Sequence, residues 1–101
     1  MTSDVIEFID SDAAYQDWLH AHPDGYVLNA WRSKNPYSTV LHGAWCKQVS
    51  NYGKISQPGS FTERGLIKIC ASDGESLREW VRQHGRTDGT FSSEECYCLK
   101  Q

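Results

Sequence analysis

Two stretches of the chain carry hydrophobic residues at helical spacing. In the first stretch the recurring apolar and aromatic positions are Ala14, Tyr15, Trp18, Leu19 and His22. Residues three or four apart lie on one side of a helix, so this pattern predicts a helix with a single buried face. Asp10 or Ser11 offers an N-cap for it, and the Pro-Asp-Gly sequence at 23–25 ends it.

The second stretch repeats the pattern near the C-terminal end. Its recurring positions are Leu77, Trp80, Val81 and His84. Ser72 and Glu75 match a capping box, in which each side chain bonds the backbone amide of the other residue. Gly85 supplies a C-terminal stop. The sequence therefore predicts a second amphipathic helix after residue 72.

Strand-forming residues fill the region between the two predicted helices. Residues 26–32 and 38–43 flank the turn signal at 33–36 and predict an antiparallel hairpin. Residues 66–71 predict a third strand, and residues 5–9 a short strand or a lead-in. We expect an α+β fold with a small three-stranded antiparallel sheet and two helices.

The length of the chain limits it to one domain. We assign residues 1–101 to a single domain, with 1–25 as an N-terminal strand and helix extension and 50–65 as a long polar loop. A chain of 101 residues with 39% hydrophobic residues buries a small core, so a metal would help to stabilise it. No apolar run is long enough to span a membrane, and no glycine-rich phosphate loop appears. We expect no membrane partner and no small-molecule cofactor.

Four cysteines are the candidates for metal binding. The N-terminal residues include early acids and lack the basic and apolar regions of a secretory signal, so we expect a cytoplasmic protein with reduced thiols. His42 and Cys46 form an H-x3-C pair after a strand, and Cys96 and Cys98 form a C-x-C pair. One imidazole and three thiolates are a usual closed set for structural Zn²⁺, which would tie the C-terminal tail to the sheet. Cys70 is an alternate ligand, and metal-free or disulfide forms stay open.

Residues 26–98 resemble a known metal-binding module. The stretches VLHGAWC, LIKICASDGESLREW and CYC follow in the order found in the Ada-type N-terminal metal-binding domain of bacterial DNA alkylation-repair regulators. That family moves a methyl group from a DNA phosphotriester to the first cysteine of its first metal-binding pair. Here His42 stands at that position. The resemblance thus implies a bacterial or phage protein that keeps zinc and DNA affinity without methyl transfer.

Charge is distributed unevenly along the sequence. Residues 1–31 carry a net charge of −6, residues 32–68 carry +5, and residues 69–101 carry −2. Cations interleaved with aromatic rings suit a phosphate backbone with stacked bases, so the central segment predicts a nucleic-acid surface. The candidate phosphate contacts are Arg32, Lys34, Lys47, Lys54, Arg64 and Lys68. The candidate stacking residues are Tyr37, Trp45 and Tyr52. The competing interpretation is a solvated face with core aromatics behind it, and Trp45 fits either role.

These observations favour a binding module over an enzyme. We expect a zinc-stabilised module that binds DNA through the central basic and aromatic segment. The alternative is a protein–protein interaction module, such as a small phage or defence-associated regulator. A third hypothesis is a thiol-dependent enzyme, but nothing in the sequence brings a cysteine and a histidine base together.

Overall fold

The computed structural model describes residues 5–46, 61–63 and 65–91. Within them the order of elements is β1 (Ile6–Phe8), α1 (Asp12–Ala21), β2 (Tyr26–Trp31), β3 (Thr39–Gly43), β4 (Leu66–Ala71) and α3 (Gly74–Gln83). The α+β class, the two helices and the predicted hairpin are confirmed. The C-terminal tail for which zinc binding was predicted lies outside the described residues.

The sheet has four strands where the sequence predicted three. Its order is β1-β4-β2-β3, and every neighbouring pair is antiparallel. The added strand is β1, which pairs with β4 through residues such as Glu7 opposite Ile69. A strand of three residues shows almost no hydrophobic alternation, so the sequence left it undecided between strand and lead-in.

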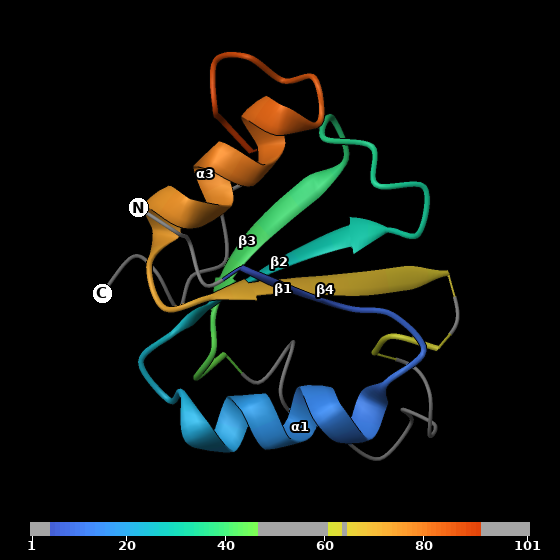
Figure 1. Cartoon of the computed structure of the whole chain (residues 1–101), viewed down its shortest axis with the longest axis vertical. Coiled ribbons are helices and arrows are strands. Elements are labelled where there is room, and N and C mark those ends of the chain that lie inside the picture. The colour runs from blue at the N-terminus through green and yellow to red at the C-terminus, as the bar shows by residue number, and fades with distance from the viewer. Residues whose placement is uncertain (1–4, 47–60, 64, 92–101) are drawn as a thin grey trace.

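The two helices cover opposite faces of the sheet (Figure 1). Residues paired in register share a face, and successive residues of a strand alternate between faces. The α1 face packs Val27 and Cys70 with Tyr15, Trp18 and other apolar side chains. The α3 face packs a second cluster that includes Leu28, Ile67, Ile69, Leu77 and Trp80. β4 is therefore buried on both sides, which explains why its sequence LIKICA does not alternate.

The ends of the helices differ in detail from the sequence prediction. The N-cap of α3 is Asp73, whose carboxylate accepts a hydrogen bond from the Ser76 amide, so the predicted Ser72–Glu75 capping box is wrong. Glu75 instead pairs with Arg82, at 3.0 Å. Ser11 is the N-cap of α1 but makes no side-chain capping bond.

Both helices end in a histidine stacked on a tryptophan one turn earlier. His22 stacks on Trp18 with 4.6 Å between ring centroids, and His84 stacks on Trp80 at 3.9 Å. Each Nδ1 lies within hydrogen-bond distance of the backbone oxygen of the same tryptophan. The two tryptophans are buried, as predicted for core residues. Within the described ranges no helix is both long and apolar enough to cross a membrane.

Candidate functional site

The connection between β2 and β3 presents two exposed aromatic rings. Trp31 ends β2 with 54% of its surface exposed, and Tyr37 lies before β3 with 62% exposed. The chain turns between them through Lys34, whose φ is +62° and whose amide donates to the Trp31 carbonyl. Asn35 then accepts a hydrogen bond from the Tyr37 amide through its side chain. The turn chemistry therefore places both rings at one end of the hairpin.

Tyr37 is held in place by two residues that follow α3. Its hydroxyl donates to the Gly85 carbonyl at 3.4 Å, and the Arg86 guanidinium lies 5.1 Å from the ring centroid. Arg86 also donates to the Pro36 carbonyl at 3.2 Å. Contacts from a separate element thus fix the exposed ring before any ligand binds.

The two surface cations of this turn lie against acids from the N-terminal segment. Arg32 donates to both carboxylate oxygens of Asp10, at 3.1 and 2.8 Å, and to the Thr62 carbonyl. The hydrogen bond to Asp10 raises the pKa of Arg32. Lys34 pairs with Glu7 at 2.7 Å. The acidic and basic segments of the sequence therefore meet in the folded molecule and partly neutralise each other.

Lys68 was predicted to contact phosphate, and the structure corrects that prediction. Only 3% of the residue is exposed, because β4 is covered on both faces. Its ammonium donates to Asn29 Oδ1 and to the Phe61 carbonyl, both at 2.8 Å. Burial lowers the pKa of Lys68 to about 8, although the nearby Asp12 carboxylate opposes this effect. The ammonium of Lys68 is therefore used for hydrogen bonds inside the molecule and is not available to a phosphate at the surface.

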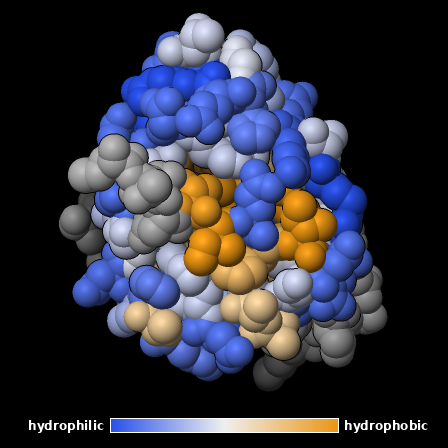
Figure 2. Space-filling model, in the orientation of Figure 1, coloured by the Kyte–Doolittle hydropathy of each residue, from blue (hydrophilic) through white to orange (hydrophobic). Residues whose placement is uncertain are grey.

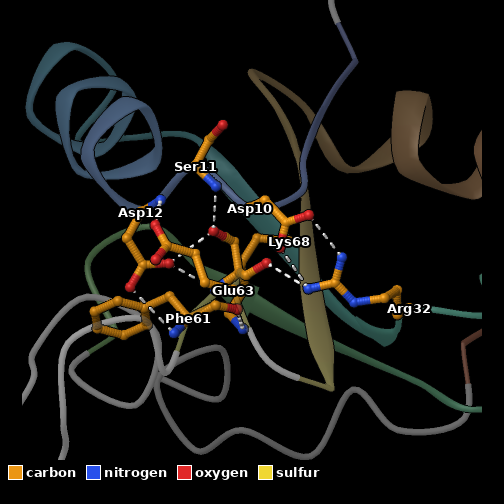
Figure 3. Close-up of polar contacts among 8 residues, drawn as sticks. Asp10, Ser11, Asp12, Arg32, Phe61, Glu63 and Lys68 are labelled. Atoms are coloured by element: carbon orange, nitrogen blue, oxygen red, sulfur yellow. Dashed lines mark hydrogen bonds and ion pairs between the residues drawn. The ribbon is translucent and has the colours of Figure 1, made fainter.

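Asp12 is the buried acid that completes this interior network (Figure 3). Its Oδ1 accepts hydrogen bonds from the amide and the hydroxyl of Thr62, both at 2.7 Å, and its Oδ2 accepts from the Phe61 amide. The Thr62 hydroxyl in turn accepts a bond from the Ser11 amide. Residues 61 and 62 are thus fixed between the start of α1 and β4. The sequence analysis missed this role for Asp12.

The described candidate metal ligands lie on or near the α1 face. His42 in β3, Cys46 after it and Cys70 in β4 are 5%, 5% and 0% exposed. Burial lowers the pKa of His42, and the charge of Lys68 adds to this effect. Burial raises the pKa of the Cys70 thiol. His42 Nδ1 is buried and has no hydrogen-bond partner among the described residues.

These residues do not form a complete metal site by themselves. Val27 pairs with both His42 and Cys70, so it separates them along one row of the sheet. Strand spacing places the Cα atoms of His42 and Cys70 about 10 Å apart. No group of three or more possible ligands occurs within the described part of the chain. Cys96 and Cys98 lie outside that part, so the four-ligand zinc site stays a prediction.

Of the other predicted nucleic-acid contacts, the structure describes one, and it lies away from the hairpin turn. Trp45 is 46% exposed and packs edge-on against Tyr26, at the opposite end of β3 from Tyr37. Lys47, Tyr52, Lys54 and Arg64 lie outside the described residues.

A surface cavity of about 420 Å³ opens beside the two exposed rings of the hairpin. Trp31 and Tyr37 line it together with Asn29, Ser38, Val40 and Leu66. The sequence analysis included neither Trp31 nor Asn29 among the candidate contacts. The available signal for Trp31 was its place near the end of a predicted strand, next to Arg32 and the polar turn.

Comparison with protein-family models, with curated proteins and with solved structures finds no match to this chain. The resemblance to the Ada-type domain therefore stays a prediction, supported by the sequence motifs alone.

Proposed function

We propose that this chain is a zinc-stabilised, cytoplasmic module that binds nucleic acid, with DNA as the expected ligand. The observation that carries the proposal is the end of the β2–β3 hairpin. There Trp31 and Tyr37 are exposed, and Arg32 and Lys34 lie between them in the sequence. Rings provide stacking surfaces for bases and cations provide phosphate contacts, so both kinds of contact are available at one place.

The ion pairs of Arg32 and Lys34 are compatible with this role. The Asp10 side chain is 65% exposed, and an ion pair between exposed side chains contributes little to stability. A phosphate group presents oxygens to a guanidinium in the same forked arrangement as a carboxylate. Phosphate can therefore displace Asp10 from Arg32 at little cost.

The proposed zinc site would use His42, Cys46, Cys96 and Cys98. The Nδ1 of His42 is buried and has no hydrogen-bond partner in the described part of the chain, and the buried thiol of Cys46 follows four residues later, which supports a metal in this region. A closed set of four ligands supplies folding energy and leaves no open position for catalysis. Because an imidazole stands where the Ada-type domain has its acceptor thiolate, the proposal excludes methyl transfer.

The test compares two arginines in similar surroundings. The side chains of Arg32 and Arg82 are 39% and 36% exposed, and both pair with carboxylates. Binding of labelled DNA is measured by fluorescence anisotropy across a range of salt concentrations. We expect affinity to fall with salt, and Arg32→Gln to lower both the affinity and the salt slope by about one counterion. Arg82→Gln is expected to behave like the wild type.

Two results would contradict the proposal. One is the absence of DNA binding by the wild-type chain at low salt. The other is equal behaviour of Arg32→Gln and Arg82→Gln, which would remove the hairpin end from the binding surface.

The second candidate function is a protein–protein interaction module, such as a phage or defence-associated regulator. It is favoured by a group of hydrophobic side chains at the centre of the face along which β1 runs (Figure 2). β1 is an edge strand, and Ile6 on it is 43% exposed. A partner protein that binds there should be lost on Ile6→Lys and retained on Arg32→Gln. The opposite pattern would favour the hairpin end.

A further inference from the structure

We propose that the cavity beside Trp31 and Tyr37 receives an unpaired nucleobase. This inference rests on the proposed function and makes it specific, because it assigns single-stranded nucleic acid as the ligand. At about 420 Å³ the cavity falls within the range of roughly 300–1,000 Å³ typical of small-ligand sites. It has an aromatic side, an aliphatic part formed by Val40 and Leu66, and polar groups from Asn29 and Ser38.

Trp31 is the available stacking surface of the cavity. Its indole makes no ring contact or side-chain hydrogen bond within the described residues. The other exposed rings differ, because Trp45 packs against Tyr26 and Tyr37 has Arg86 over its ring. A large exposed ring without a partner is suited to stack on a planar ligand.

Tyr37 forms a second and separately anchored aromatic side. Gly85 and Arg86, which follow α3, hold this ring, whereas Trp31 belongs to β2. No ring–ring interaction joins the two within the described residues. The cavity between them is therefore formed in advance, which reduces the ordering cost of binding.

Asn29 supplies a hydrogen-bond donor whose orientation is fixed. The Lys68 ammonium can only donate, so the amide atom facing it at 2.8 Å must be Oδ1. The amide nitrogen then points away from Lys68, and it makes no hydrogen bond within the described part of the chain. Since Asn29 lines the cavity, we infer that this nitrogen donates to an acceptor on the edge of the base.

The surroundings favour a base attached to a backbone over an apolar peptide side chain. Arg32 and Lys34 do not line the cavity, but they follow Trp31 by one and three residues, so the turn that leaves the cavity carries two cations for the flanking phosphates. A base inside a duplex has both faces stacked and its edge paired, and it cannot enter such a cavity. An unpaired base offers its face to Trp31 and its edge to Asn29.

The experiment compares three labelled oligonucleotides on the full chain. These are a short single-stranded oligothymidylate, the same backbone with abasic residues in place of the bases, and a duplex. We expect the single strand with bases to bind most tightly. Trp31→Ala should weaken its binding by on the order of ten- to a hundredfold, as a lost base–aromatic stack does, with little effect on the abasic strand.

Two further variants complete the design. Tyr37→Ala is expected to weaken binding of the single strand in the same sense as Trp31→Ala. Ile6→Ala, an exposed apolar residue away from the cavity, is expected to leave binding unchanged. Because Trp31 and Tyr37 are more than half exposed, circular dichroism should show both variants folded as the wild type is.

Three results would overturn the inference, and they have different consequences. Equal affinity for the base-containing and abasic strands would mean that phosphates alone are bound, so the cavity assignment fails while nucleic-acid binding stands. Binding of none of the oligonucleotides at low salt would remove both proposals. The third result is that the chain binds no oligonucleotide but selects a peptide from a random library, and that Trp31→Ala no longer binds this peptide. The cavity would then receive a protein side chain.

Discussion

Lys68 and Asp12 are opposite charges inside a small core, and each is held by several hydrogen bonds. The ammonium of Lys68 donates to Asn29 and to the Phe61 carbonyl, and the carboxylate of Asp12 accepts from the backbone of residues 61 and 62. Burial of one charge without the other is costly, because the remaining charge loses both water and its counter-charge. The two residues therefore act together in fixing residues 61 and 62 to the sheet.

Replacement of Asp12 tests this network. Asp12→Ala leaves the amides of Phe61 and Thr62 without their acceptor and removes a counter-charge from Lys68. We expect the free energy of unfolding to fall by about 2–4 kcal/mol, measured by urea denaturation followed by circular dichroism. Asp17→Ala, on the exposed side of the same helix, should change it by no more than about 0.5 kcal/mol. Equal effects of the two substitutions would show that the network contributes nothing.

β1 pairs with β4, and the side chain of Glu7 adds two contacts from this edge strand to other parts of the fold. Glu7 accepts a hydrogen bond from Trp80 Nε1 at 2.7 Å and pairs with Lys34 at 2.7 Å. It therefore links the edge strand to α3 and to the hairpin turn. The sequence could predict the longer elements, because residues such as Trp18 and Trp80 repeat at helical spacing. It could not place β1, since the partners of Glu7 are distant in sequence.

The contribution of Glu7 is expected to depend on pH. Partial burial raises the pKa of Glu7, but the hydrogen bonds from Lys34 and Trp80 outweigh this effect, so its pKa lies below the ordinary value of 4.5. A carboxyl whose pKa is lower in the folded state than in the unfolded state stabilises the fold. This stabilisation is complete at pH values above the pKa of the unfolded state, and it is lost as the pH falls through the pKa of the folded state. Stability curves for the wild type and Glu7→Gln should therefore separate at pH 7 and converge as the pH falls through the lowered pKa of Glu7. A constant difference across this range would contradict the assignment.

Across the whole molecule, the fold brings together charges that the sequence keeps apart. The acidic segment 1–31 and the basic segment 32–68 meet through Asp10 with Arg32 and Glu7 with Lys34. Charge counting along the chain predicted a strongly basic surface, and it could not predict this pairing or the burial of Lys68. The turn signal at 33–36 did locate the exposed hairpin turn, because a polar turn between two strands lies at the surface in almost any topology.

Zinc is expected to stabilise the molecule as a whole. Under reducing conditions the purified wild-type chain should hold about one equivalent of zinc by mass spectrometry, and a chelator should lower its unfolding temperature sharply. His42→Ala and Cys98→Ser should each lose the metal. Cys70→Ala should keep it, because Val27 separates Cys70 from His42 in the sheet.

The pattern across these variants distinguishes the possible ligand sets. If Cys70→Ala loses zinc and Cys98→Ser keeps it, then Cys70 is a zinc ligand in place of the C-terminal pair. A wild-type chain without zinc, whose four cysteines do not react with a thiol reagent until it is reduced, would establish disulfides instead. A metal-free chain with a reactive Cys46 would leave the buried Nδ1 of His42 without the partner that zinc was proposed to provide. In the two metal-free cases the hairpin end and its cavity would need a source of stability other than zinc.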